Sequence, residues 1–320
     1  MVDFAESIRK AYARIKSDIR RTPLEYSEPL SRETGARVNV KWECDQHTGS
    51  FKLRGALNKL RSLSEEDRNR GVVSASTGNH GLAIGRASRL EGVGLKLFLP
   101  ETAAEVKRAR IEAMGVDVEV RGASCEKAEA IARGFAGRTG RVFVSPYNDW
   151  DIVLGAGTVG LELAGDPGRF DDVLVPVGGG GLIAGMAGFL KAVRPGVRVV
   201  GVEPVTSAFM AASLAAGRLV DIEEKETVAD AVAGGIEPGS ITFPLCRDLL
   251  DSIVCVPEQR IRQAMALVHA CHGRMVEGAG ALPLAALLEF PRTFAGRSVV
   301  AVVSGANIAP ERFRAVTGLT

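Results

Sequence analysis

The chain has 320 residues, of which 46% are hydrophobic and 24% charged, and this composition excludes a disordered or low-complexity protein. Forty Lys and Arg residues against 38 Asp and Glu residues leave a net charge of +2, too balanced for a protein that binds nucleic acid or an anionic membrane by charge. Five cysteines without CxxC spacing argue against a disulfide framework and favour a reducing, cytoplasmic location. The length predicts two domains, or one large domain with an insertion.

The N-terminal segment predicts an amphipathic helix, because Phe4, Ile8, Tyr12 and Ile15 recur with helical spacing. It contains no apolar block, so we expect no signal peptide. The longest apolar stretches, such as residues 282–288, are far shorter than a membrane-spanning helix requires. We therefore expect a protein that does not interact with membranes.

Short apolar and β-branched runs then alternate with helical patterns along the chain. Strands are predicted at residues 37–43, 72–74, 95–99, 116–120, 142–144, 173–177, 197–202, 253–256 and 298–303. Helices are predicted at residues 103–114, 125–135, 182–193 and 258–273. This alternation predicts an α/β fold with mostly parallel sheets, whose ligands bind beyond the carboxyl ends of the strands.

Four closely spaced strand–helix units between residues 71 and about 145 indicate a compact insertion. Turn-forming residues flank it on both sides. We therefore predict a small domain at residues 71–148 inside a large domain formed by residues 1–70 and 149–320.

The segment TGSFKLRGA, residues 48–56, contains the first candidate for catalysis. Ser50 is a favourable N-cap, which would place Lys52 in the first turn of a helix. The positive end of the helix dipole disfavours an ammonium there and favours the neutral amine that Schiff-base chemistry needs. Taken alone, Lys52 fits an ordinary surface lysine as well.

Two further segments are suited to binding anions. Residues 76–81, STGNHG, put hydroxyl, amide and N–H groups at a helix start, which suits a substrate carboxylate and also an ordinary capped turn. Residues 178–181 are four glycines between a strand and a helix, so N–H groups can converge on a phosphate without side chains intruding. This loop matches neither a P-loop nor a GxGxxG fingerprint. Ser304 places another hydroxyl at the end of a buried strand.

In this order and spacing, the segments resemble fold-type II pyridoxal-phosphate enzymes of the serine/threonine dehydratase and serine racemase group. The resemblance covers nearly the whole chain, from Thr22-Pro23-Leu24 through QHTGSFKLRGA, STGNHG and the four glycines to SGAN at residues 304–307. It implies a tryptophan synthase β-like fold with two open, mostly parallel sheets, flanking helices and pyridoxal 5'-phosphate as cofactor. Relatives are commonly dimers, so a homodimer is expected.

The resemblance also assigns roles residue by residue. Lys52 would hold the cofactor through a Schiff base and act as the catalytic base. Ser304 would face the pyridine nitrogen, where a hydroxyl supports a positive ring less well than a carboxylate does. The other implied cofactor contacts are Phe51, Asn79, Gly178, Gly179, Gly180, Gly181 and Glu277. The implied substrate contacts are Ser76, Thr77, Asn79, His80 and Tyr147.

Several positions depart from the family pattern. Thr77 stands where serine racemases carry a serine that acts as a second acid or base, so racemisation is possible but less favoured. Glu203 matches a metal-ligand glutamate, but the second carboxylate falls on Phe209, which weakens a divalent-cation site and leaves a structural hydrogen bond or a monovalent ion as alternatives. His269 and His272 share a helix face without a fourth ligand, and are interpreted as ordinary helix residues.

The predicted function is a dehydratase, or ammonia-lyase, that converts a small β-hydroxy amino acid such as L-threonine or L-serine to a 2-oxo acid and ammonia. The alternative within the same fold is a racemase, or a dehydratase of 3-hydroxyaspartate or a hydroxyectoine-pathway intermediate. A non-catalytic phosphate-binding module is the alternative from another class, and it would have no use for Lys52. The chain stops soon after Ser304, so we expect no C-terminal regulatory domain.

Overall fold

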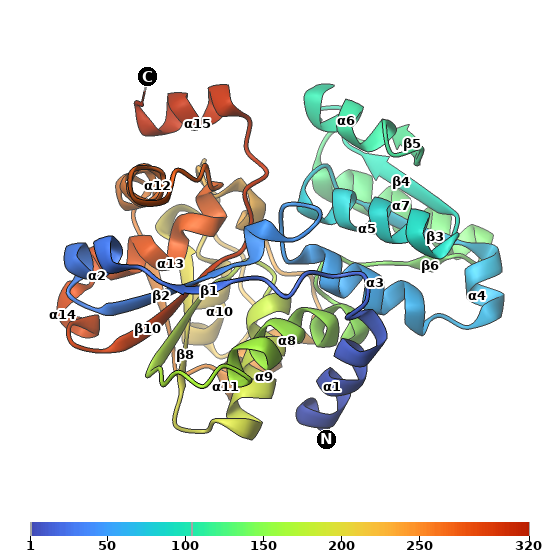
Figure 1. The fold of residues 1–320 in the computed structure, drawn as a ribbon. Coiled ribbons are helices and arrows are strands. Elements are labelled where there is room, and N and C mark those ends of the chain that lie inside the picture. The colour runs from blue at the N-terminus through green and yellow to red at the C-terminus, as the bar shows by residue number, and fades with distance from the viewer. Residues whose placement is uncertain (1, 104, 320) are drawn as a thin grey trace.

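The computed structural model describes residues 2–103 and 105–319 and contains two β-sheets flanked by helices (Figure 1). Residue 104, within a predicted helix, lies outside the described residues. The larger sheet has the strand order β1 (Leu24–Tyr26), β2 (Arg37–Trp42), β10 (Ser298–Val303), β7 (Asp172–Pro176), β8 (Arg198–Pro204), β9 (Ser252–Val256). The smaller sheet has the order β5 (Asp117–Val120), β4 (Leu95–Leu99), β3 (Val72–Ala75), β6 (Val142–Phe143).

All neighbouring strands are parallel except β1, which pairs antiparallel with β2. The predicted α/β class with two mostly parallel sheets is thus confirmed, and the nine predicted strands are present within two residues of their expected ends. The sequence patterns missed β1, which is only three residues long and has no buried residue. The strands of the smaller sheet lie inside residues 71–148, whose bounds as a domain stay a prediction.

The larger sheet is buried on both faces, which explains its continuous apolar strands. On β10, Val299 and Ala301 pack into one core while Val300 and Val302 pack into the other. The first face is covered by α2 (Glu28–Thr34), α12 (Glu258–His272), α13 (Gly278–Glu289), α14 (Pro291–Phe294) and α15 (Pro310–Thr317). The second is covered by α8 (Trp150–Ala164), α9 (Gly181–Val193), α10 (Phe209–Ala216) and α11 (Thr242–Leu249).

The smaller sheet is also covered on both faces. One face packs on α5 (Asn79–Glu91) and α6 (Glu105–Glu112), and the other on α7 (Cys125–Thr139). Helix α3 (Lys52–Ser62) packs on the outer side of α5, and α1 (Phe4–Ile15) packs mainly on α8 and α9. Helix α4 (Glu65–Arg70) and three 3-10 turns, η1 (Glu43–Asp45), η2 (Val205–Ser207) and η3 (Asp230–Val232), complete the elements. No helix in the described ranges has the length and apolar character to cross a membrane.

Helix α3 joins the two bodies, because it packs against α5 on one side and α8 on the other. Glycines make these helix contacts close. A Cβ atom at Gly185 on α9 would lie 2.8 Å from the backbone nitrogen of Gly157 on α8, and one at Gly55 on α3 would lie 2.9 Å from the carbonyl oxygen of Ile152. The glycines therefore set how near α3, α8 and α9 approach one another, and so where α3 begins.

We predict that Gly185→Ala lowers the free energy of unfolding by about 1–3 kcal/mol or more, since the added methyl meets backbone atoms that cannot move aside. Gly137→Ala is the matched control: Gly137 is an exposed glycine inside α7, where an added methyl group would meet open space. It should raise stability by about 0.5–1 kcal/mol. Urea denaturation of both variants measures the difference, and equal effects would contradict the close-packing argument.

Candidate functional site

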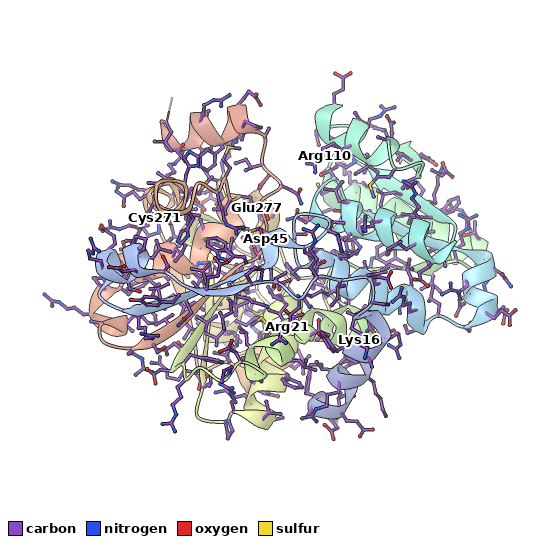
Figure 2. The ribbon with its side chains drawn as sticks, in the orientation of Figure 1. Lys16, Arg21, Asp45, Arg110, Cys271 and Glu277 are labelled. Atoms are coloured by element: carbon purple, nitrogen blue, oxygen red, sulfur yellow. The ribbon has the colours of Figure 1, made fainter. Side chains whose placement is uncertain are left out.

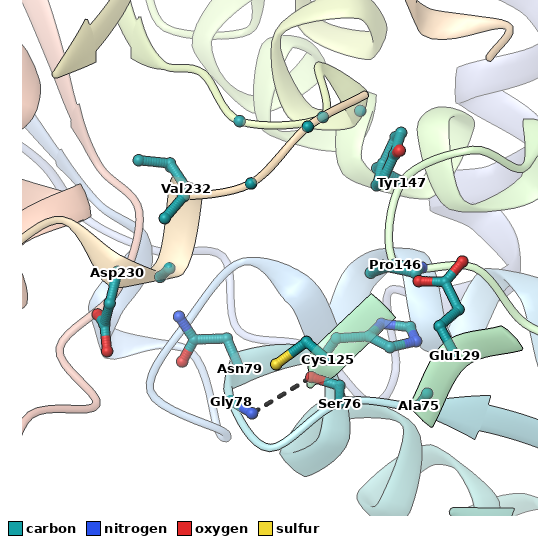
Figure 3. A pocket seen from close by; sticks show the side chains of 18 of the residues that line it. Ala75, Ser76, Gly78, Asn79, Cys125, Glu129, Pro146, Tyr147, Asp230 and Val232 are labelled. Carbon is teal, nitrogen blue, oxygen red and sulfur yellow. Dashed lines mark hydrogen bonds between the residues drawn. The ribbon is translucent and has the colours of Figure 1, made fainter. Parts of the chain in front are cut away.

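A cavity of about 890 Å³ lies where the carboxyl ends of β3, β7 and β10 face one another (Figure 3). It gathers residues from both sheets that the sequence patterns had placed in separate segments. Of the predicted site residues it is lined by Phe51, Lys52, Ser76, Thr77, Asn79, His80, Tyr147, Gly178, Gly179, Gly180, Gly181, Glu277 and Ser304. Glu203 does not line it.

Lys52 is the first residue of α3, and its Nζ donates to the carbonyl oxygen of Pro146 at 2.8 Å. Burial lowers the pKa of Lys52 to about 8, although the carboxylate of Glu277 acts in the opposite direction. An enclosed amine at the positive end of a helix dipole is one that loses its proton readily. Lys52 therefore has the character of a nucleophile rather than of a surface lysine.

The structure corrects the expected helix cap. The N-cap of α3 is Phe51, and no side chain caps the helix. Ser50 instead forms an antiparallel bridge with Gly305, and its buried hydroxyl has no hydrogen-bond partner among the described residues. The reason is that the backbone N–H of Phe51 donates to the Ser304 carbonyl at 3.1 Å, which ties the start of α3 to the end of β10.

A buried cluster of four charged residues joins α3 to β2 and α8. Arg54 on α3 donates to Glu43 Oε2 at 2.8 Å and to Glu162 Oε1 on α8 at 2.7 Å. Lys41 on β2 donates to Glu162 Oε2 at 2.6 Å. Burial opposes charge on Glu43, but Arg54 and Lys41 outweigh it and hold its pKa below the usual range. Because the charges balance and are mutually bonded, the cluster fixes β2, α3 and α8 in one arrangement.

The four-glycine loop is shaped so that only glycine fits. A Cβ atom at Gly178 would lie 2.9 Å from the Val232 carbonyl oxygen, and one at Gly179 would overlap the ring of Tyr147. Gly180 has a φ of +85°, in the left-handed region. The loop ends at the first turn of α9, where backbone N–H groups have no partner inside the helix. This is the geometry of a phosphate site.

Tyr147 lies against this loop and closes one side of the cavity (Figure 3). Its hydroxyl oxygen accepts a hydrogen bond from the backbone N–H of Glu237 at 2.9 Å. Burial raises the pKa of Tyr147 to about 12. Tyr147 therefore stays a neutral phenol at physiological pH and shapes the cavity without adding charge.

Asn79 and Glu277 meet on the other side of the cavity. Asn79, the first residue of α5, donates through Nδ2 to Glu277 Oε1 at 2.6 Å, and both side chains are buried. Asn307, which the sequence motif contained but to which no role was assigned, bonds to both. Its role could have been anticipated only from the pairing of distant segments. Ser304 is buried nearby and lines the same cavity.

The STGNHG segment forms the turn that leads into α5. Ser76 Oγ accepts from the backbone N–H of Gly78 at 3.2 Å (Figure 3), and Thr77 lines the cavity. His80 is 3% exposed, and burial lowers its pKa to about 3. Its Nε2 lies 3.1 Å from the Ser74 hydroxyl, which itself donates to the Val144 carbonyl.

The protonation of His80 follows from these contacts. The hydroxyl hydrogen of Ser74 is donated to the Val144 carbonyl, so Ser74 Oγ can only accept from His80, whose Nε2 must carry the ring hydrogen. The neutral ring then has its acceptor at Nδ1. That nitrogen is buried without a partner in the part of the chain that the structure describes. A carboxylate would therefore be met by the first-turn N–H groups of α5 and not by the His80 ring.

Glu203 lies at the end of β8, and its carboxylate caps α10. Oε1 accepts from the N–H of Met210 at 3.0 Å and Oε2 from that of Ala211 at 2.7 Å. Burial raises the pKa of Glu203 to about 7. Within the described residues it belongs to no group of three potential metal-ligating His, Cys, Asp or Glu side chains. The cation at Glu203 stays a prediction.

This fold and site define an enzyme class. Residues 15–305 match the family model described as pyridoxal-phosphate dependent enzyme, and the chain belongs to that family. The L-threonine ammonia-lyase of Thermotoga maritima is 40% identical over 95% of this chain and 75% of its own length. The catabolic L-threonine dehydratase of Escherichia coli K12 is 35% identical over 98% of this chain and 95% of its own.

Solved structures agree with these sequence relatives. A processed threonine deaminase isoform from Solanum lycopersicum superposes with a TM-score of 0.92 at 32% identity, covering 99% of this chain and 93% of that one. Maize serine racemase superposes with a TM-score of 0.91 at 34% identity, covering 96% and 94%. The predicted fold type is therefore confirmed.

The cavity also fits the cofactor of this family on its own chemistry. The glycine loop offers N–H groups to a phosphate, and the enclosed amine of Lys52 suits attachment to an aldehyde. The Ser304 hydroxyl is available to bond to a ring nitrogen. The Asn79 amide retains one N–H for a ring oxygen, because its other N–H is donated to Glu277.

We predict that the apoprotein combines with pyridoxal phosphate at a rate that rises with pH with a midpoint near pH 8. The reason is that burial lowers the pKa of Lys52 to about 8, so the neutral amine predominates above that pH. Stopped-flow absorbance of the cofactor measures the rate, with Lys52→Arg as the control that lacks a reactive amine. A midpoint near 10.5, the value of an ordinary lysine, would contradict the enclosed amine.

A second prediction concerns Glu203. Its pKa is raised from 4.5 to about 7 by burial, so the folded state holds a proton that the unfolded state has lost between these values. The native protein should therefore lose stability relative to Glu203→Gln as the pH rises from about 4.5 to about 7, with little further change above. Urea denaturation across this range measures it. A difference that is independent of pH would show that Glu203 is ionised in the folded state throughout.

Proposed function

We propose that the chain is a pyridoxal-phosphate-dependent ammonia-lyase that converts a small β-hydroxy amino acid, L-threonine or L-serine, to a 2-oxo acid and ammonia. The observation that carries the proposal is Lys52, an enclosed amine whose pKa is lowered to about 8, in one cavity with the glycine loop and the Ser304 hydroxyl. The Thermotoga and Escherichia relatives are named for threonine, and this supports the substrate class.

Each group in the cavity then has a distinct task. The bound cofactor supplies an electron sink for the electrons released at the substrate α-carbon. Lys52, as the neutral amine, takes the α-proton and becomes an ammonium, and the β-hydroxyl leaves as water with one proton gained, so the elimination itself consumes no net proton. Ser304 gives the ring nitrogen a neutral partner, which favours rapid elimination over long-lived carbanion chemistry.

The substrate carboxylate is assigned to the turn at residues 76–80. The hydroxyls of Ser76 and Thr77 and the first-turn N–H groups of α5 supply donors there. Tyr147 limits the space beside the glycine loop. These groups orient the substrate so that its α-hydrogen faces Lys52. Holding the two reacting groups in this geometry accelerates the proton transfer.

The small domain, residues 71–148, is proposed to close over the substrate and exclude water. It already contacts the large domain at the cavity rim, where Arg133 on α7 donates to Glu237 Oε2. A reactive product that hydrolyses in water is best formed in a closed site. Closure brings the carboxylate-binding turn and Lys52 together.

A racemase remains the second candidate because the Thr77 hydroxyl lines the cavity where a second acid or base would act. Maize serine racemase and an aspartate racemase are among the similar structures. Chiral analysis of serine after incubation, beside a 2-oxo acid assay over threonine, serine and 3-hydroxyaspartate, separates the two reactions.

We further propose that the protein is a homodimer located in the cytoplasm. Light scattering on the purified protein tests the dimer.

Lys52→Ala is predicted to bind pyridoxal phosphate without covalent attachment and to lose at least about 1000-fold in kcat, because both the attachment point and the base are removed. Borohydride reduction followed by peptide mass analysis should label Lys52 in the native protein and nothing in the variant. Lys59→Ala, a lysine on the same helix that pairs with Asp149, is the control and should keep the label. Turnover by Lys52→Ala close to that of the native protein would overturn the proposal.

A further inference from the structure

Asn307 occupies a junction of four chain segments beside the cavity. Its Nδ2 donates to the Thr48 carbonyl at 2.8 Å, just before α3, and to Asn79 Oδ1 at 2.5 Å, at the start of α5. Its backbone N–H donates to Glu277 Oε2 at 3.1 Å, at the start of α13. Asn307 thus bonds to the loop of Lys52, to Asn79 and to Glu277 at once.

These contacts determine which way the Asn79 amide faces. A carboxylate can only accept, so the atom of Asn79 next to Glu277 must be the nitrogen. The carbonyl oxygen then faces Asn307, whose own nitrogen must point toward it because the Thr48 carbonyl on the same side is also an acceptor. Asn79 is left with one N–H, and it offers the cavity a donor and never an acceptor.

Two glycines lie close against the amides of this junction. A Cβ atom at Gly49 would lie 2.8 Å from Asn307 Oδ1, and Gly49 has a φ of +73°. On the opposite side, a Cβ atom at Gly305 would overlap the Glu277 carboxylate and lie 3.2 Å from Asn79 Nδ2. The absence of a side chain at these two glycines therefore allows the amides of Asn79 and Asn307 to lie close to the backbone there.

The side-chain oxygen of Asn307 contacts helix α6, which packs beside the smaller sheet. Oδ1 accepts from Nη2 of Arg110 on α6 at 3.1 Å. Figure 2 shows Arg110 on the body of the smaller sheet and Glu277 on that of the larger one. This contact is exposed, whereas the bond between Asn79 and Glu277 is buried. Arg110 therefore completes the bonding of Asn307 without setting the direction of its amide.

We propose that Asn307 is a positioning residue for the cofactor: it holds the carbonyl side of Asn79 while Glu277 holds the nitrogen side, so that the free N–H of Asn79 meets the ring oxygen. The inference rests on the proposed function, because it takes the ligand beside Asn79 to be pyridoxal phosphate. It adds a residue that touches neither the cofactor nor the substrate and acts through Asn79.

The test compares Asn307→Ala and Asn307→Asp with the native protein. The first removes both donors, and the second puts an acceptor against Asn79 Oδ1 and forces that amide to turn. Both should raise the dissociation constant for pyridoxal phosphate at least about tenfold, as expected for loss of a bond to a charged oxygen. Both should also change the absorption maximum of the bound cofactor, with the larger change in Asn307→Asp. Thermal unfolding of the apoproteins verifies that the variants fold, and Asn307→Ala carries the test if Asn307→Asp does not.

Arg110→Gln is the matched control, because it removes the charged contact at Asn307 Oδ1 and leaves both bonds donated by Asn307 Nδ2 in place, so the cofactor spectrum should stay unchanged. An Asn307→Ala spectrum and affinity equal to the native values would overturn the inference, as would the same spectral change in Arg110→Gln. Borohydride labelling distinguishes failure of the proposed function from failure of the inference about Asn307 alone. A native protein without label at Lys52 overturns the proposed function and this inference together, whereas a labelled native protein with an unaltered Asn307→Ala overturns the inference alone.

Discussion

The buried pairing of Arg54 with Glu43 and Glu162 is the constraint on which the rest of the site depends. Arg54 lies two residues after Lys52 on the same helix, and its guanidinium is wholly enclosed. A buried cation without its partners would cost several kcal/mol, so α3 has one acceptable position relative to β2 and α8. The amine of Lys52 is placed by that position, and its lowered pKa follows from it.

Glycine provides the second constraint, because several of the chain's 37 glycines are required by close contacts rather than by flexibility. The glycines of α8 and α9 let helices touch backbone to backbone. Those at Gly178–Gly181 open a surface of N–H groups, and Gly49 and Gly305 make room for the amides around Asn307. In each case a methyl group would occupy the space that another part of the chain needs. Close packing therefore produces both the helix layers and the binding surface.

Much of the fold could be predicted from the sequence because its strands are buried on both faces and form continuous apolar runs. The run at residues 298–303 was predicted to the residue for this reason. The strand β1 could not be predicted in this way, because its three residues, none of which is buried, carry no apolar pattern. The cavity residues came from local motifs, but the pairing of Glu162 with Arg54, and of Asn79 with Asn307, joins segments far apart in the chain. Spacing along a sequence does not reveal such contacts. The helix cap expected at Ser50 does not form because Ser50 instead pairs with Gly305, just beyond the end of β10.

The place of β10 in the larger sheet has a consequence for how the molecule forms. Among the described residues β10 is the last strand along the chain, yet it lies between β2 and β7 and bonds to both. While the ribosome is still making residues 298–303, β2 and β7 each expose an unpaired inner edge, the kind of surface that recruits other chains. Ser304 and Asn307 directly follow the same strand and line the cavity, so the pairing of these two edges and this part of the cavity wall are completed by one event, after β2 and β7 have been made.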